Sequence, residues 1–200
     1  MTIIKDGTGE GYLAKVDSDN FLHVSARTYT LMTNVSIRDQ FAFSAIGTTQ
    51  IVANTEKTVL IIINNAASLI PVAVKSIVQS LQGESGKPVT FKGYVGKKTY
   101  TSGGTQITPA NFYAGSSNIL NVTIYQDNNP SDLVLGGVDY EFGRIFMETT
   151  GTTEFLFDGA MIIPPGGSGR VTVTGATGAA GTNYAVEVVQ YFGINIESIK

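Results

Sequence analysis

Few side chains in this chain could do chemistry, and they are scattered. The sequence holds one histidine, His23, and no cysteine. These counts exclude a histidine-based catalytic triad, a multi-histidine metal site, a thiolate ligand and a cysteine nucleophile within the chain. General-base catalysis needs a proton acceptor that partner groups hold in place. Because His23 stands in a short, polar, alternating stretch, we expect it to be an ordinary side chain of a strand with no catalytic role.

Two groups of carboxylates have the residue types of a cation site without its pattern. The stretch Asp17–Asn20 begins like a calcium-binding loop, but Phe21 and Leu22 stand where that loop requires an oxygen ligand and a glycine. A turn is favoured there, since Asp and Asn are common turn residues. The second group could meet around a cation, although loop acids are usually just solvated. Its members are Asp127, Asp132, Asp139 and Glu141.

Enzyme motifs are matched only in fragments. Gly83–Lys87 (GESGK) has the lysine of a phosphate-binding loop but neither its spacing nor the following Ser or Thr. Gly166–Gly169 does not fit a nucleophile elbow. Glu148, Glu154 and Asp158 resemble a glycosidase pair in residue type alone. We therefore expect no enzymatic activity, no catalytic residue, no cofactor and no metal site.

The composition predicts strands and turns. Glycine accounts for 23 of 200 residues. Charged residues make up only 14%, against roughly 25% in an average soluble domain. The net charge of −3 gives no indication of nucleic-acid binding, which needs a clustered basic surface. A surface with few charges is inexpensive to desolvate, so it suits permanent contact with other subunits.

The sequence gives no indication of a membrane protein. Its longest apolar runs, such as Val59–Ile63, are far shorter than the roughly 20 residues that span a bilayer. The first residues lack the cationic, apolar and small-residue pattern of a signal peptide. We therefore expect synthesis in a cytoplasm and no membrane partner.

Alternation of apolar and polar residues dominates the chain and predicts strands. About a dozen short strands, separated by glycine-rich turns and showing no helical period, predict an all-β, jelly-roll-like β-sandwich. The run Thr58–Asn64 is apolar on both faces and is predicted to lie centrally. Gly136–Gly137 is predicted to be a turn, and Glu154–Phe157 and Ala160–Ile163 are predicted to be separate strands.

Residues 5–26 alternate as strands do, yet they are too polar and too rich in glycine to form a good core. Two short runs on either side of residues 17–20 predict a β-hairpin. Isolated hairpins are marginally stable in water, so this one needs contacts with a partner to be stable. The sequence thus divides into an extended N-terminal arm and connector, residues 1–37, and a jelly-roll-like domain, residues 38–200.

The opening stretch resembles the start of many tailed-bacteriophage virion proteins. The shared pattern is the element Lys5–Gly9, then Ala14–Asp17, then a polar turn and the strand Leu22–Val24. Later segments, among them VTFKGYVG and MIIPPGGSGRVTV, look like the jelly-roll body of such proteins. The likeness covers most of the chain, in order.

This resemblance implies a capsid decoration or cement protein, a structural protein of the virion. Such proteins have a jelly-roll body, are often homotrimers, lie on the exterior of the head and are made in the cytoplasm of the host bacterium. The arm would bind the major capsid protein by adding strands to a neighbouring sheet edge, and so stabilise the head. Its expected contact residues are Lys5, Asp6, Gly7, Gly9, Tyr12, Leu13, Lys15, Val16, Phe21, Leu22 and His23.

Three alternatives stay open. Residues 5–26 could instead complete the chain's own sheet, as terminal strands often do. The protein could also be a receptor- or glycan-binding module at a fibre or tail tip, with aromatic rings on loops 100–118 and 126–143 stacking on sugars. Those rings belong to Tyr100, Phe112, Tyr113, Tyr125 and Tyr140. A glycan-degrading enzyme is disfavoured because the enzyme motifs fail.

Overall fold

A computed structural model describes residues 15–16, 22–23, 40–82, 87–127, 132–148, 151–178 and 184–193. For residues 15–16, 22–23, 82, 158–160, 184, 186–188 and 192 it describes the backbone alone. The strands are β1 (Lys15–Val16), β2 (Leu22–His23), β3 (Ala42–Gln50), β4 (Glu56–Asn64), β5 (Val72–Gln82), β6 (Val89–Ser102), β7 (Thr105–Ile107), β8 (Ala110–Asn111), β9 (Val122–Gln126), β10 (Val134–Met147), β11 (Gly151–Ile163), β12 (Ser168–Gly175) and β13 (Tyr184–Gly193). Within these residues there is no helix of a length and apolar character that could cross a bilayer.

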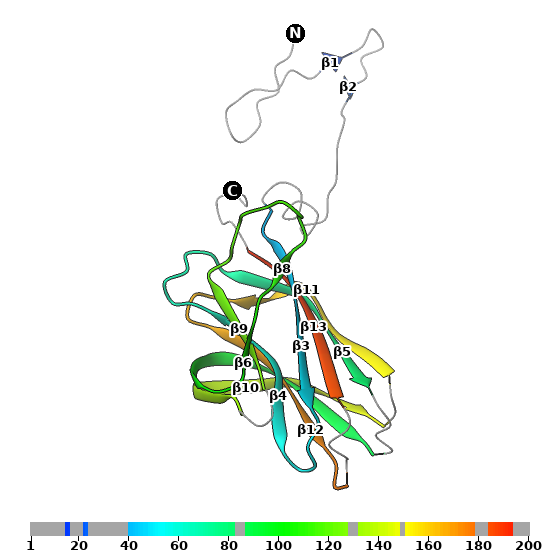
Figure 1. Ribbon diagram of the computed structural model, residues 1–200. Coiled ribbons are helices and arrows are strands. Elements are labelled where there is room, and N and C mark those ends of the chain that lie inside the picture. The colour runs from blue at the N-terminus through cyan, green and yellow to red at the C-terminus, as the bar shows by residue number, and fades with distance from the viewer. Residues whose placement is uncertain are drawn as a thin grey trace. The chain divides into compact units, whose positions relative to one another are not determined.

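Residues 42–193 form a sandwich of two antiparallel sheets (Figure 1). One sheet has the strand order β10-β6-β12-β4-β9-β7, and the other has the order β11-β5-β13-β3-β8. Eight strands follow the jelly-roll order, with β3, β13, β5 and β11 in one sheet and β4, β12, β6 and β10 in the other. The predicted all-β, jelly-roll-like sandwich is therefore confirmed.

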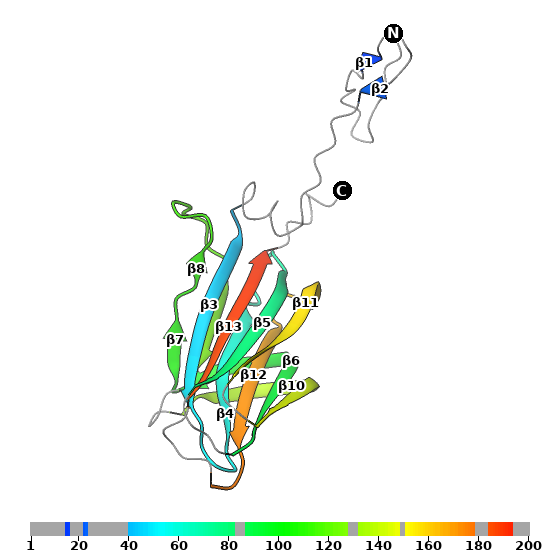
Figure 2. The same ribbon diagram turned by 90° about the vertical axis from the view of Figure 1, so that its right-hand side faces the viewer.

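The three remaining strands are an insertion between β6 and β10. β9 and β7 extend one sheet beyond β4, and β8 extends the other sheet beyond β3. The insertion thus lies at one side of the sandwich, and β10 and β11 are the edge strands at the opposite side (Figure 2).

The central position of β4 follows from its residues. β4 lies between β12 and β9, and its residues 58–64 are all buried. A strand that is covered on both faces has no need of polar alternation, which explains the continuous apolar run. The prediction that Thr58–Asn64 lies centrally is confirmed.

Tyr191 is a buried phenol in the core. Its side chain is 0% exposed and stacks on Phe43, with ring centroids 5.7 Å apart. Its hydroxyl group has no hydrogen-bond partner among the described residues. Burial raises the pKa of Tyr191 above its ordinary value. The folded protein therefore favours the neutral phenol, and this contribution to stability is present below pH about 10 and is lost as the pH rises further.

Replacing Tyr191 by Phe removes this pH-dependent group. At neutral pH we expect the free energy of unfolding to stay the same or to rise by up to about 1 kcal/mol, because an unpaired buried hydroxyl group is removed. Above pH about 10 the variant should lose less stability than the unmodified protein. Urea unfolding at both pH values measures this, with Tyr113→Phe as a control at an exposed ring. A loss above about 1 kcal/mol at neutral pH would mean that the hydroxyl group is paired.

The hairpin at the start of the chain belongs to a separate unit, residues 1–30, and is described by itself. β1 pairs antiparallel with β2, with Lys15 opposite His23 and Val16 opposite Leu22. The predicted hairpin is confirmed at these positions. The two strands form a sheet of their own. The other predicted arm residues, Lys5, Asp6, Gly7, Gly9, Tyr12, Leu13 and Phe21, lie outside the described residues, as does the predicted domain boundary at 37–38.

Candidate functional site

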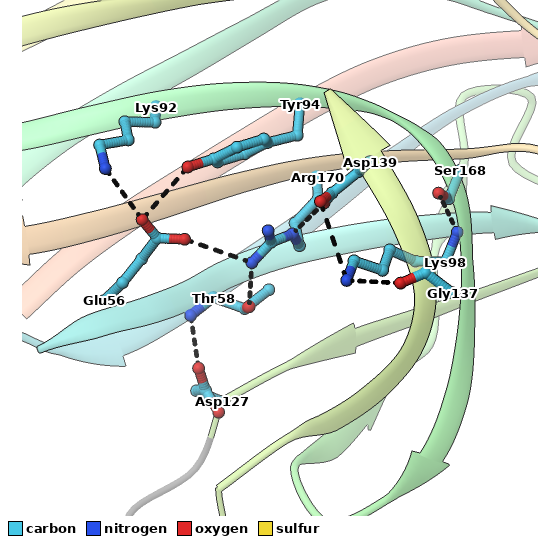
Figure 3. Close-up of polar contacts among 10 residues, drawn as sticks. All are labelled: Glu56, Thr58, Lys92, Tyr94, Lys98, Asp127, Gly137, Asp139, Ser168 and Arg170. Atoms are coloured by element: carbon cyan, nitrogen blue, oxygen red, sulfur yellow. Dashed lines mark hydrogen bonds and ion pairs between the residues drawn. The ribbon is translucent and has the colours of Figure 1, made fainter. Parts of the chain in front are cut away.

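A network of charged side chains crosses one face of the sheet that contains β4, β6, β10 and β12 (Figure 3). Val171 and Val173 of β12 are buried in the core. Because side chains alternate along a strand, Arg170 and Thr172 project from the outer face. The network therefore lies on the outside of the sandwich, where a ligand or a partner could reach it.

Arg170 is the centre of this network. Its Nε donates a hydrogen bond to Asp139 Oδ2 over 2.8 Å. Its Nη1 lies 3.6 Å from Glu56 Oε1 and 3.5 Å from Thr58 Oγ1. The guanidinium carbon lies 4.5 Å from the ring centroid of Tyr94, within the range of a cation–π contact. Only 13% of the Arg170 side chain is exposed, so these contacts are shielded from water.

Glu56 is the second centre of the network, and it accepts hydrogen bonds from two side chains. Its Oε2 accepts hydrogen bonds from Lys92 Nζ over 3.1 Å and from the Tyr94 hydroxyl group over 3.2 Å. The hydrogen bond to Glu56 raises the pKa of Lys92. Burial, followed by the charge of Glu56, raises the pKa of Tyr94. Both groups therefore stay protonated at neutral pH, and neither is suited to act as a general base.

A pocket of about 280 Å³ opens beside the network. It is lined by Thr55, Glu56, Lys57, Thr58, Lys98, Asp127, Asp132, Leu133, Leu135 and Arg170. The Lys98 ammonium group donates a hydrogen bond to the Gly137 carbonyl over 3.0 Å and lies 3.8 Å from Asp139 Oδ1. The volume is just below the roughly 300 Å³ at which small-molecule pockets begin.

The four acids from the 127–141 region do not converge on a cation. Each has a protein partner: Asp127 accepts from the backbone N–H groups of Thr58 and Leu133, Asp132 pairs with Lys57, Asp139 with Arg170, and Glu141 with Arg144. In the described part of the chain no three potential metal ligands come together. These acids neutralise nearby cations and organise backbone.

The chemistry that this arrangement supports is limited. The pocket lining holds three cationic residues, Lys57, Lys98 and Arg170, and three acidic ones, Glu56, Asp127 and Asp132. Their formal charges cancel, and partners already satisfy them. The arrangement ties four strands together and suits a neutral polar molecule better than an ion. Within it, no nucleophile stands beside a free base.

The aromatic residues predicted to lie on loops are spread over several elements. Tyr100 lies in β6 and Tyr140 in β10, so the loop assignment is wrong for these two residues, whereas Tyr125, which stands between the two predicted loops, lies in β9. It fails because β6 and β10 pair along almost their whole length, with Leu135 opposite Tyr100 and Tyr140 opposite Val95. The exposed fractions are 43% for Tyr100, 47% for Phe112, 46% for Tyr113 and 69% for Tyr140.

Of these rings, Tyr100 and Tyr125 are brought together. Their centroids are 4.2 Å apart and their planes differ by 4°, which is a stacked pair. Phe112 and Tyr113 follow β8, which ends at Asn111, and so lie in a loop as predicted. Among the described residues, no ring contact joins Phe112, Tyr113 or Tyr140 to this pair.

Reasoning from the sequence did not find the Arg170 network. One signal was available, because Lys92 and Tyr94 stand at alternate positions of one strand and Arg170 stands among the valines of another. Alternation shows that such side chains share a face with each other. It does not show that Arg170 lies beside Asp139 and Glu56, which depends on the strand order.

A comparison with models of protein families finds no match for this chain, and a search of curated proteins finds no match either.

Proposed function

We propose that the protein is a non-enzymatic capsid decoration protein of a tailed bacteriophage, which binds the outer surface of the head through its arm. The observation that carries this proposal is the separate two-stranded sheet of β1 and β2. The jelly roll of residues 42–193 has its full set of strands without them. A hairpin this short is marginal in water and gains most from pairing with another chain.

The non-enzymatic part of the proposal is supported by the polar network. Its acids are paired with cations or backbone N–H groups, and Lys92 and Tyr94 hold their protons. A decoration protein needs a rigid body, and ion pairs between four strands suit that purpose. The network then serves stability and surface hydration.

The mechanism is multivalent clamping of the major capsid protein. Each arm adds backbone hydrogen bonds and a few apolar contacts to a neighbouring sheet edge. One such contact is modest, but arms that are linked in an oligomer, a trimer by the resemblance, bind with a high effective concentration. The protein is made in the host cytoplasm and joins the exterior of the assembled head, where it stabilises the shell.

A cryo-EM map of the particle that carries the protein tests this proposal. We expect density on the outside of the head, with residues 5–26 lying along neighbouring subunits. Density at a tail tip or fibre end, with these residues paired only with their own chain, would overturn it.

A glycan-binding module at a fibre or tail tip is the second candidate. The stacked rings of Tyr100 and Tyr125 favour it, because Tyr100 is 43% exposed and a ring held in place by stacking offers a flat apolar face to a sugar. For a decoration protein we expect no measurable binding of the purified protein to host envelope polysaccharide. Saturable binding that is lost in Tyr100→Ala and kept in Tyr113→Ala would favour this second function.

A further inference from the structure

The pocket beside the Arg170 network has hydrogen-bond donors that are not used within the described part of the chain, although each charge there has a partner (Figure 3). Arg170 makes its polar contacts through Nε and Nη1, so its Nη2 has no hydrogen-bond or ion-pair partner among the described residues. The Lys98 ammonium group donates one hydrogen bond, to the Gly137 carbonyl, and its 3.8 Å distance from Asp139 is too long for a second. The buried Thr58 hydroxyl group accepts a contact of 3.5 Å from Arg170 and donates to none of the described residues.

The same pocket offers acceptors and an apolar wall. Asp132 is paired through Oδ1, which leaves Oδ2 without a partner among the described residues, and 62% of this side chain is exposed. Glu56 Oε1 lies 3.6 Å from Arg170, which is an ion pair but too long for a hydrogen bond. Leu133 and Leu135, both half-buried, form the apolar part of the lining.

This combination favours a neutral molecule that carries several hydroxyl groups. A hydroxyl group both donates and accepts, so it can satisfy the unused donors and the unused acceptors together. An anion would meet Glu56 and Asp132, and a cation would meet Arg170 and Lys98. The volume of about 280 Å³ is close to the lower limit of small-molecule pockets, which suits one ring better than a chain of rings.

We propose that this pocket binds one free, neutral, polyhydroxylated ring, that is, a monosaccharide or a cyclic polyol. The C–H groups of the ring would lie against the two leucines, and its hydroxyl groups would bind the polar lining. The inference goes beyond capsid binding, since the arm takes no part in it. It also differs from glycan binding by the stacked tyrosines, neither of which lines the pocket. Such pockets bury most of their ligand, so a unit linked on both sides within a polysaccharide would fit poorly.

Saturation-transfer-difference NMR of the full chain tests the proposal with four neutral probes, namely D-glucose, D-galactose, N-acetyl-D-glucosamine and myo-inositol. We expect at least one of them to bind with a Kd of about 1 mM, as suits a small polar ligand. D-glucuronate and D-galacturonate keep the ring and add a carboxylate, so they should bind at least about tenfold more weakly than the neutral probe. Absence of binding by all four neutral probes, or equal binding of the charged ones, would overturn the proposal.

Lys98→Met removes a donor from the lining and keeps most of the side-chain length. It should weaken binding of the neutral probe at least about tenfold, since a charged hydrogen bond is lost. Lys97→Met is the matched control, because this exposed neighbour in β6 loses the same charge but does not line the pocket. Circular dichroism during heating reports the fold of both variants. Equal weakening by the two variants, or unchanged binding by a folded Lys98→Met, would contradict the proposal.

Two further variants keep the test decisive if Lys98→Met does not fold. Asp132→Asn changes an exposed side chain and gives the lining a net positive charge, so D-glucuronate should bind at least about threefold more tightly than it binds the unmodified protein. Tyr100→Ala should bind the neutral probe as the unmodified protein does. No gain in D-glucuronate binding, or loss of the neutral probe in Tyr100→Ala, would place the ligand outside the pocket and overturn the proposal.

Discussion

Deletion of residues 2–26 is expected to abolish binding to phage heads while the body still unfolds cooperatively. The jelly roll has its complete set of strands between residues 42 and 193, so its core survives the deletion. The deletion removes the backbone groups and apolar side chains that would pair with the capsid. Loss of the arm contact also removes the gain in avidity from linked sites, which is on the order of 10²–10⁴.

The measurement is co-sedimentation with heads that lack the protein, and circular dichroism during heating reports the fold. A full-length chain with residues 5–26 in scrambled order is the matched control, since it keeps length and composition. It should bind as weakly as the deletion. Full occupancy of heads by the shortened protein would instead assign the capsid contact to the body. Failure of the shortened protein to fold would place residues 2–26 in the body's own sheets.

Replacement of Asp139 by Ala is expected to have the largest effect on stability among single changes in the polar network. Asp139 accepts the hydrogen bond from Arg170 Nε, and its side chain is only 10% exposed. Without Asp139, the guanidinium group of Arg170 has only the more distant carboxylate of Glu56 as an ion-pair partner. Lys98 loses the carboxylate that lies beside its ammonium group. Breaking a buried ion pair typically costs about 3–5 kcal/mol, and we expect about 3 kcal/mol here because solvent reaches the edge of the network.

Urea unfolding measures the change, and Lys92→Ala is the control. Without Lys92, Glu56 still accepts the hydrogen bond from the Tyr94 hydroxyl group and still pairs with Arg170. We therefore expect the free energy of unfolding to fall by no more than about 1 kcal/mol. The double variant Asp139→Leu with Arg170→Met should recover much of the loss, because neither charge is then left unpaired. If Asp139→Ala costs less than about 1 kcal/mol, the network does not hold the strands together.

The fold class could be predicted because its signals are local. Alternation of apolar and polar residues shows where strands run, and a continuous apolar run shows a strand that is covered on both faces. Thr58–Asn64 is such a run, and it lies in the centre of its sheet. The hairpin was also predictable, since two short alternating runs flank a polar turn.

The ends of strands were harder to predict, because glycine occurs both in turns and where two backbones approach closely within a sheet. Gly136–Gly137 was predicted to be a turn, and this prediction is wrong: both residues lie inside β10, opposite Thr99 and Lys98 of β6. Gly137 has φ +74°, and an added Cβ atom would lie 2.1 Å from the Lys97 carbonyl oxygen. The glycine is there so that two backbones can approach closely within a sheet, which the sequence does not distinguish from a turn.

A bulged strand caused the second error. Glu154–Phe157 and Ala160–Ile163 were predicted to be two strands, but they are parts of β11, with a register shift between Leu156 and Met161. Irregular residues in the middle of a strand break the alternation without ending the pairing.

The contacts between strands in the polar network could not be predicted. Arg170 and Asp139 are 31 positions apart, and Arg170 and Glu56 meet only because β12 pairs with β4. Which strands are neighbours is decided by long-range packing, and many orders satisfy the same alternation.

The Gly193 amide donates a hydrogen bond to the Phe41 carbonyl over 3.0 Å. The start of β3 and the end of β13, the first and last described strands of the body, therefore lie side by side. This neighbourhood makes the jelly roll a candidate for circular permutation. A short linker could join residue 193 to residue 40, and new termini could be opened between β12 and β13, at the other end of those strands. Every strand pairing within the body would be kept, and a foreign peptide could be fused at the end of the molecule away from Phe41.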